Sequence, residues 1–261
     1  MRITTRRRAR LASAALAAAG LTMIASPALA ATAAPQYLVP YGQLTCGAGP
    51  IEPGTYISIL VTGNCWLTNF GTVVINGDLR VAHDAKFDGT TSGTLIVDGN
   101  FFSGTNSVTD MGMAGSNDVI MGDVYADNAY EMAWNNVTVG GWYDVVAQDH
   151  YTDNTDCSQT DMNGTPDGFS FVQGSVGGFF NYQDNRTCTM NLLNSHVTGT
   201  VSVNGNLTNV TVPGIGYRSP QIAGNSIGGA LNCTNNKPAP TLDHGRANTA
   251  ARGKHGQCAH L

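Results

Sequence analysis

A short repeat anchored on glycine constrains the fold more than any other feature of this chain. Ile or Val, any residue, Gly, any residue and a large apolar residue recur seven times, with glycines at Gly77, Gly99, Gly122, Gly141, Gly178, Gly199 and Gly229. All fourteen flanking positions are apolar, although only 42% of the chain is hydrophobic. We therefore interpret the pattern as structural. Gly205 offers a competing register for the sixth copy, and Gly199 is preferred because the valines on both sides of it then face inward together.

Apolar residues two positions apart predict strands with one buried face. A second column lies seven residues after the glycines and carries Asn or Asp in five of seven copies, at Asp84, Asn106, Ala129, Gln148, Asn185, Asn206 and Asn236. Asn tolerates the left-handed backbone of sharp turns, so we expect turns at this column. Strand, turn and strand recurring at intervals of 19 to 37 residues predict an all-β parallel β-helix, or solenoid, of about seven to eight coils. A β-sandwich is the alternative.

The two ends of the chain differ from the repeats. Residues 1–30 combine five arginines, no acid, a short apolar run and the small-residue stretch Ala28–Ala30, which predicts a secretory signal peptide. We expect an N-terminal segment and cap over 31–70, the β-helix over 71–236 and a capping tail over 237–261. The 37-residue interval from Gly141 to Gly178 predicts an insertion at about 147–172.

Six cysteines follow the expected signal peptide, an even number that indicates disulfides in an exported chain. Fifteen pairings are open in principle. The grouping into sequential couples favours Cys46 with Cys65, Cys157 with Cys188 and Cys233 with Cys258, which would staple both ends of the solenoid and bracket the insertion. The sequence contains no CxxC motif, which argues against structural zinc.

The last expected coil and the tail resemble a known family. The matching segments are Asn225–Cys233, Asn236–Pro240 and Gly253–Cys258, with similar repeats at Val137–Gly141, Ser175–Gly178 and Asn194–Val201. They resemble secreted right-handed parallel β-helix proteins of actinobacteria, most of which have no assigned activity. The resemblance implies a right-handed parallel β-helix outside the cell, and it supplies no catalytic residues that could be carried over to this chain. The chain departs from the family repeat at Trp142 and Phe179, where the family carries Asn.

The residues one and three positions after each glycine should face solvent. There the middle coils gather aromatic and amide side chains, a combination that suits sugar rings with their apolar faces and polar rims. The candidate ligand-binding residues are Asn100, Phe102, Tyr125, Trp142, Phe179 and Asn181. Alternatively, the insertion folds over Trp142 and Phe179 and makes them a small second core.

Two sets of residues on this side of the chain would suit catalysis. Asp123 and Asp144 should lie one coil apart and offset by two residues, with Cα atoms about 8 Å apart, which fits the carboxylate pair of a glycoside hydrolase. His150 or Tyr151 with Arg186 would suit a polysaccharide lyase, which needs a base and a cation. Asp161, Asn163 and Asp167 loosely resemble a calcium loop, but an ordinary turn is the simpler interpretation.

Without residues 1–30 the chain has eight basic and 18 acidic side chains, a formal charge of −10. This charge argues against nucleic-acid binding, and no later segment predicts a membrane span. We therefore expect a secreted, extracellular protein that binds a polysaccharide. The alternatives are a polysaccharide-degrading enzyme, either a glycoside hydrolase or a lyase, and a structural cell-surface or matrix protein. None of these interpretations requires a cofactor, and calcium is a candidate ligand.

Overall fold

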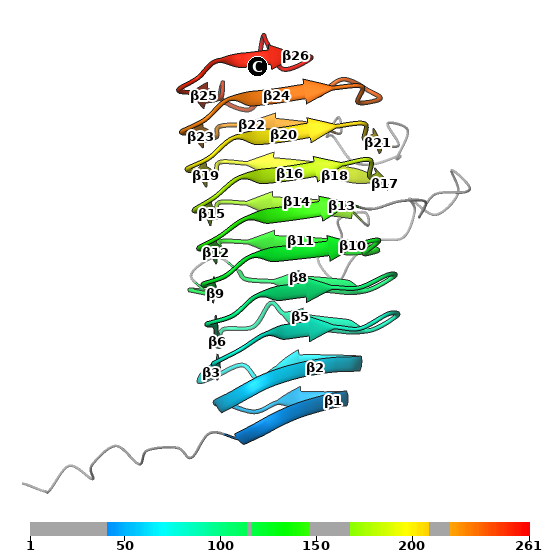
Figure 1. Ribbon diagram of the computed structural model, residues 1–261, viewed down its shortest axis with the longest axis vertical. Helices are drawn as coiled ribbons and strands as arrows, with labels where there is room; N and C mark the ends of the chain where they lie inside the picture. Colours follow the sequence, from blue (N-terminus) through cyan, green and yellow to red (C-terminus); the bar gives the residue numbers. More distant parts are fainter. Residues whose placement is uncertain (1–40, 114–115, 147–167, 209–219) are drawn as a thin grey trace, which may run out of the picture. The chain divides into compact units, whose positions relative to one another are not determined.

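The computed structural model describes residues 41–113, 116–146, 168–208 and 220–261. The chain divides into two units, Met1–Tyr37 and Leu38–Leu261, and every described residue belongs to the second. Within the described residues all regular structure is β, and the strands form one long parallel sheet that winds into coils (Figure 1). The prediction of an all-β parallel solenoid is confirmed.

Three columns of parallel strands form the walls of the coil. The first contains β3 (Thr72–Ile75), β6 (Thr94–Val97), β9 (Val119–Ile120), β12 (Thr138–Val139), β15 (Ser175–Val176), β19 (His196–Val197), β23 (Ser226–Ile227) and β25 (Thr249–Ala250). The second contains β4 (Leu79–Val81), β7 (Phe101–Ser103), β10 (Val124–Asp127), β13 (Tyr143–Val146), β16 (Phe180–Gln183), β20 (Val201–Asn204), β24 (Leu231–Thr234) and β26 (Lys254–Gly256). The third contains β5 (Lys86–Gly89), β8 (Val108–Met111), β11 (Glu131–Asn135), β14 (Gly168–Val172), β18 (Thr189–Leu193) and β22 (Gln221–Ala223). The last five residues of the expected insertion are therefore β14.

Long strands begin the stack, and short ones extend it beyond residue 236. The strand β2 (Gly54–Leu67) pairs in turn with β3, β4 and β5, and β1 (Tyr41–Ile51) pairs with β2. At the other end, β25 and β26 continue the first two columns. The parallel ladder thus starts before residue 71 and continues past residue 236. A short fourth side is formed by β17 (Arg186–Thr187) and β21 (Leu207–Thr208).

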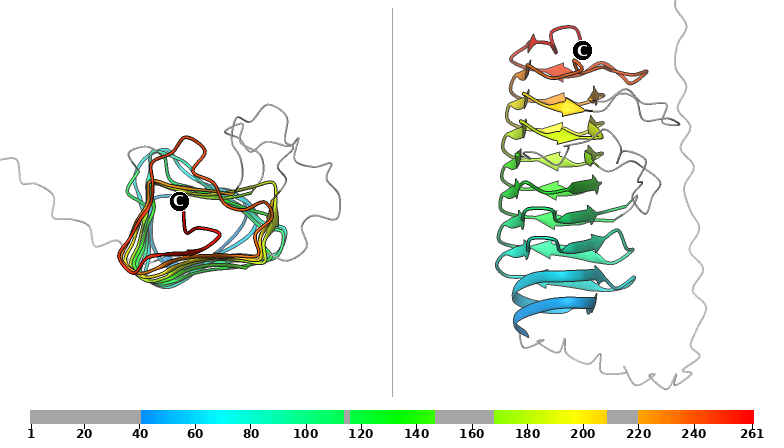
Figure 2. Two further views of the ribbon diagram at one scale, coloured as in Figure 1. Left: turned by 90° about the horizontal axis from the view of Figure 1, so that it is seen from above. Right: turned by 90° about the vertical axis from the view of Figure 1, so that its right-hand side faces the viewer.

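Disulfides join neighbouring coils at both ends of the stack. Cys46 of β1 is bonded to Cys65 of β2, and Cys233 of β24 is bonded to Cys258, as predicted. Cys188 is also disulfide-bonded, but its predicted partner, Cys157, lies outside the described residues. The side chain of the final residue, Leu261, is buried, and in the view along the stack the chain ends inside the outline of the coils (Figure 2). The C-terminal residues thus cover apolar core at this end.

The seven repeat glycines stack directly on one another, and we call them the glycine spine. Each N–H after the first donates to the carbonyl of the preceding glycine, from Gly99 on Gly77 to Gly229 on Gly199, at 2.8–3.0 Å. A Cβ at Gly99 would lie only 2.6 Å from the carbonyl of Gly77, so larger residues do not fit this contact. The choice of Gly199 over Gly205 is confirmed. Gly205 is instead a turn residue with a φ of 71°.

All fourteen apolar residues that flank the spine are buried, with no exposure above 3%. The middle coils hold the largest of them. Tyr143 stacks on Phe180 with ring centroids 4.8 Å apart and meets Trp134 edge-on at 5.4 Å. These contacts fill the coil interior with rigid rings at the level where the outer face also carries aromatic residues.

The asparagines of the second predicted column form a buried ladder, which we call the asparagine ladder. Asn185 donates from Nδ2 to Asn206 Oδ1 at 2.8 Å, Asn206 donates likewise to Asn236 at 2.8 Å, and Asn236 donates to Gln257 Oε1 at 3.1 Å. The turn interpretation is right at Asp84 and Asn106, which have φ values of 58°. It is wrong for the ladder asparagines, because the left-handed residue there is the preceding one: Asp184, Gly205 or Asn235.

Candidate functional site

The outer face of the second column has the register that the sequence predicts. Successive pairings place side chains in one row across neighbouring coils: Arg80, Phe102, Tyr125, Asp144, Asn181, Ser202 and Asn232. Because parallel strands lie about 4.8 Å apart, this row spaces its side chains regularly along the stack. The site therefore rests on a rigid backbone lattice rather than on loops.

The first aromatic pair of this face is Phe102 on β7 and Tyr125 on β10. Their rings stack with centroids 5.6 Å apart and an interplanar angle of 17°. The guanidinium carbon of Arg80 lies 3.9 Å from the centroid of the Phe102 ring, a cation–π contact. Arg80 lies three residues after Gly77, so the predicted register also puts it on the outer face, but it was not among the predicted ligand-binding residues. Its position beside Phe102 in that register could have identified the contact.

The second aromatic pair is Trp142 and Phe179, each directly after a spine glycine. Their rings stack with centroids 4.6 Å apart and an interplanar angle of 27°, and Trp142 is 46% exposed. The two pairs occupy four successive coils and together form a strip about 14 Å long, which we call the aromatic face. The strip consists of Phe102, Tyr125, Trp142 and Phe179. Stacking covers one face of each ring, so a ligand would meet ring edges and the outer part of the indole.

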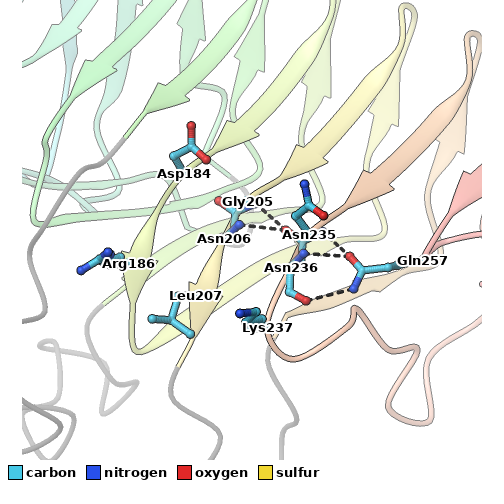
Figure 3. A pocket seen from close by; sticks show the side chains of 9 residues that line it. All are labelled: Asp184, Arg186, Gly205, Asn206, Leu207, Asn235, Asn236, Lys237 and Gln257. Carbon is cyan, nitrogen blue, oxygen red and sulfur yellow. Dashed lines mark hydrogen bonds between the residues drawn. The ribbon is translucent and has the colours of Figure 1, made fainter.

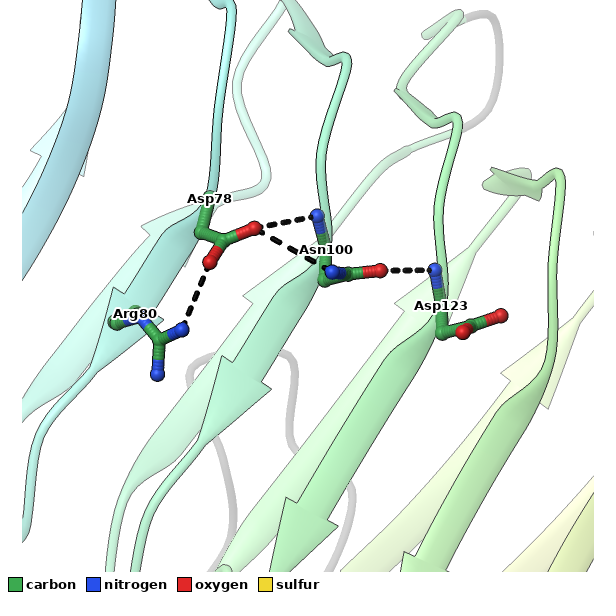
Figure 4. A network of polar contacts seen from close by, with 4 residues as sticks. All are labelled: Asp78, Arg80, Asn100 and Asp123. Carbon is green, nitrogen blue, oxygen red and sulfur yellow. Dashed lines mark hydrogen bonds and ion pairs between the residues drawn. The ribbon is translucent and has the colours of Figure 1, made fainter.

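Acid and amide side chains beside the aromatic face bind the backbone of the next coil. Asp78 accepts a hydrogen bond from the N–H of Asn100 at 3.0 Å, and Asn100 accepts one from the N–H of Asp123 at 2.9 Å (Figure 4). Asp123 continues the series by accepting from the N–H of Trp142 at 2.8 Å. These hydrogen bonds form one continuous series from Asp78 to Trp142 and hold the backbone of Trp142 in position.

The same contacts shift two pKa values. Partial burial alone would raise the pKa of Asp78, but hydrogen bonds from Asn100 and Arg80, with the charge of Arg80, outweigh it and lower that pKa below its ordinary value. The Tyr125 hydroxyl donates to Asp123 Oδ2 at 3.1 Å, and this bond, more than desolvation and the nearby carboxylates, raises the pKa of Tyr125. The tyrosine therefore stays a neutral donor.

The structure places Asp123 and Asp144 on adjacent coils with the expected two-residue offset, because Tyr125 pairs with Asp144. Both side chains already accept hydrogen bonds. Asp123 accepts from Trp142 and Tyr125, and Asp144 accepts from Asn181 Nδ2 at 2.8 Å. All six predicted ligand-binding side chains contact one another or a neighbouring coil, and Asn181 does so through Asp144.

The remaining predicted residues lie elsewhere. Arg186 lies on β17, in the short sheet at a corner of the coil, and not on the aromatic face. The other lyase candidates, His150 and Tyr151, fall outside the described residues, as do the calcium candidates Asp161, Asn163 and Asp167. Within the residues that the structure does describe, no three His, Cys, Asp or Glu side chains cluster as metal ligands would.

Comparisons of the chain with protein-family models, with curated proteins and with solved structures find no match. The described part of the chain contains no helix long and apolar enough to cross a membrane. The chain contains the disulfides Cys46–Cys65 and Cys233–Cys258, and disulfides persist mainly in oxidising compartments.

Proposed function

We propose that this is a secreted, extracellular protein that binds a polysaccharide through the aromatic face. The observation that carries the proposal is the half-exposed indole of Trp142, stacked on Phe179 on the outside of the coil. Contiguous patches of large apolar side chains at a protein surface commonly mark binding sites.

The neighbouring groups suit a carbohydrate in particular. Sugar rings present apolar C–H surfaces and hydroxyl groups together, and the aromatic face is bordered by carboxylates and amides such as Asp144, Asn181 and Asn100. Because the hydrogen bonds within the sheet hold these groups in position, little side-chain freedom is lost when a ligand binds. The strip of about 14 Å would accommodate several sugar units of an extended chain.

The proposal is tested by comparing Trp142→Ala with Trp66→Ala. Both tryptophans are partly exposed, at 46% and 41%, but Trp66 lies on β2 and pairs with the third column. A glycan array would identify the ligand, and titration calorimetry would measure its affinity. We expect Trp142→Ala to weaken binding about tenfold or more and Trp66→Ala to leave it unchanged. Equal effects, or none, would contradict the proposal.

Product assays separate binding from turnover. Wild-type protein incubated with the ligand identified on the array should release neither reducing ends nor unsaturated products. Reducing ends that disappear in Asp123→Asn or Asp144→Asn would establish a glycoside hydrolase instead, and unsaturated products would establish a lyase. A protein that binds no glycan would favour the structural cell-surface role. Sequencing the N-terminus of the exported protein tests cleavage after Ala30.

A further inference from the structure

Acidic and basic side chains are distributed unevenly along the chain. From Asp88 to Asp184 the sequence contains fourteen of its 18 acidic side chains and no Lys or Arg. Six of the eight basic side chains that follow residue 30 come after Asp184. Two of them, Arg186 and Lys237, lie at a corner of the coil near its C-terminal end (Figure 3). Because a solenoid stacks successive segments of the chain, its middle coils are acidic and its last coils are basic.

The four rings of the aromatic face all belong to this acidic stretch of the chain. Three carboxylates lie on the same coils and on the same outer side. Asp123 comes directly after a spine glycine, Asp144 pairs with Tyr125 on the neighbouring strand, and Asp127 follows Tyr125 by two residues on β10. All three are half-buried or exposed. A ligand on the aromatic face therefore meets negative charge on more than one coil.

The protein uses these carboxylates only in part. Asp144 Oδ1 accepts from Asn181, and Asp144 Oδ2 accepts no hydrogen bond from the described residues. The side chain of Asp127 has no hydrogen-bond or ion-pair partner in the described part of the chain. The pKa of Tyr125 is raised chiefly by its hydrogen bond to Asp123, with desolvation and the charges of Asp123 and Asp144 adding to this. The carboxylates thus impose a negative potential on an aromatic surface.

At one end of the face, the chain itself places a cation on such a surface. The guanidinium carbon of Arg80 lies 3.9 Å from the centroid of the Phe102 ring, and Arg80 Nη2 lies 2.8 Å from Asp78 Oδ2. This cation combines an aromatic ring with a carboxylate, and Asp78 already neutralises it. Trp142 has Asp144 two residues further on and on the same outer side, but among the described residues no Lys or Arg lies over its ring. The second aromatic pair therefore offers a cation the same kind of surface without supplying one.

We propose that the polysaccharide of the aromatic face is one whose sugar units carry free amino groups, such as a polymer of glucosamine or galactosamine. Its ammonium groups would pair with Asp144 and Asp127, and the C–H surface of its rings would meet the exposed part of Trp142. The same carboxylates would repel a polyuronate, and a neutral chain would gain no charge pairing from them. This inference rests on the proposed function and names the class of polysaccharide.

The experiment compares oligosaccharides that differ only at the amine. Hexamers of glucosamine and of galactosamine are titrated beside their N-acetylated forms, a galacturonate hexamer and a hexalysine peptide. We expect the free-amine hexamers to bind at least about tenfold more tightly than the N-acetylated ones, because several ammonium–carboxylate pairs contribute together. Most of this difference should disappear as salt rises from about 0.01 M to about 1 M. The galacturonate hexamer should not bind, and hexalysine should bind more weakly than the amino sugars.

Variants of single carboxylates test which charges act. Asp144→Asn and Asp127→Asn should each weaken binding of the free-amine hexamers about threefold and leave binding of the N-acetylated hexamers unchanged. The matched control is Asp84→Asn, which removes the same charge from an exposed side chain on a coil outside the aromatic face. Asp84 lies in a left-handed turn that Asn also adopts readily, so this control should fold and bind as wild type does.

The outcomes separate this inference from the proposed function. If N-acetylated hexamers bind as tightly as free-amine hexamers, and Trp142→Ala weakens both, the inference is overturned and the proposed function stands. If no glycan binds, both are overturned. Free-amine binding that Trp142→Ala leaves unchanged would show a general attraction of cations to the acidic coils and would overturn the inference. Hexalysine that binds as tightly as the amino sugars would overturn it in the same way.

Discussion

Replacing Asn206 with alanine should lower the free energy of unfolding by about 4 kcal/mol, because four hydrogen bonds of about 1 kcal/mol each depend on this one buried side chain. Its Nδ2 donates to the carbonyl of Tyr182 at 2.9 Å and to Asn236 Oδ1 at 2.8 Å. Its Oδ1 accepts from the N–H and the Nδ2 of Asn185 at 3.0 and 2.8 Å. Since domains are stable by only about 5–15 kcal/mol, a loss of this size is large.

Urea unfolding with the disulfides intact, followed by near-ultraviolet circular dichroism, would measure this loss. Asn76→Ala is the control, because the Asn76 side chain lies exposed at a turn of the first coils and should cost less than about 0.5 kcal/mol. Asn206→Asp should be at least as damaging as Asn206→Ala at neutral pH, since a buried carboxylate accepts from Asn185 but cannot donate to Tyr182. A change in the free energy of unfolding below about 1 kcal/mol for Asn206→Ala would refute the conclusion that the asparagine ladder stabilises the coil.

Two further predictions concern the spine and a buried acid. Gly141→Ala should lower the melting temperature and weaken glycan binding together, because the added Cβ would collide with Asp123 Oδ1 beside the aromatic face; unchanged thermal unfolding would contradict the close contact. Burial raises the pKa of Asp118 from 3.8 to about 6, although the N–H of Leu95 donates to its Oδ1 at 2.8 Å. The folded state therefore binds this proton more tightly than the unfolded state, so the free energy of unfolding should fall by about 3 kcal/mol as pH rises from about 3 to about 7. Asp118→Asn should remove this slope in urea titrations at several pH values, and an unchanged slope would assign it to other groups.

The inward and outward faces of the coil could be predicted because the same packing requirements act on every repeat. The contact between spine glycines excludes a Cβ, and the alternation of the strands requires apolar residues on both sides. Both demands recur on each coil, so they appear as a period in the sequence. The placement of Trp142 and Phe179 on neighbouring coils followed from that register, and the structure adds that their rings stack.

The sequence could not distinguish a buried asparagine ladder from a row of turns, because Asn is common in both. Asn is favoured in left-handed turns for its short polar side chain, and that side chain also bridges buried backbone groups. At Asn106 the first use applies, and at Asn206 the second. The difference depends on whether the preceding residue takes the left-handed conformation, as Gly205 does, and adjacent pairs such as Gly205 with Asn206 were the available signal.

One row of residues at the corner of the coil escaped sequence reasoning for a different reason. Arg186, Leu207 and Lys237 share no residue type, and their spacing of 21 and then 30 residues follows coils of unequal length. Only the pairing of β17 with β21 and the bridge from Leu207 to Lys237 bring them into one row. A row of unlike residues leaves no period in the sequence, so it can be recognised only once the register of the coils is known.

A stack of parallel strands fixes the distance between outward side chains on successive coils at about 4.8 Å, whatever those side chains are. The spacing of the aromatic face along the stack therefore comes from the backbone lattice that the spine supports, and the stacking of its own rings adds to this. This separates the effects of substitutions. Changing Trp142 removes a proposed ligand contact but leaves the lattice intact, whereas changing Gly141 disturbs the lattice itself. We therefore expect Trp142→Ala to lose binding without losing stability, and Gly141→Ala to lose both.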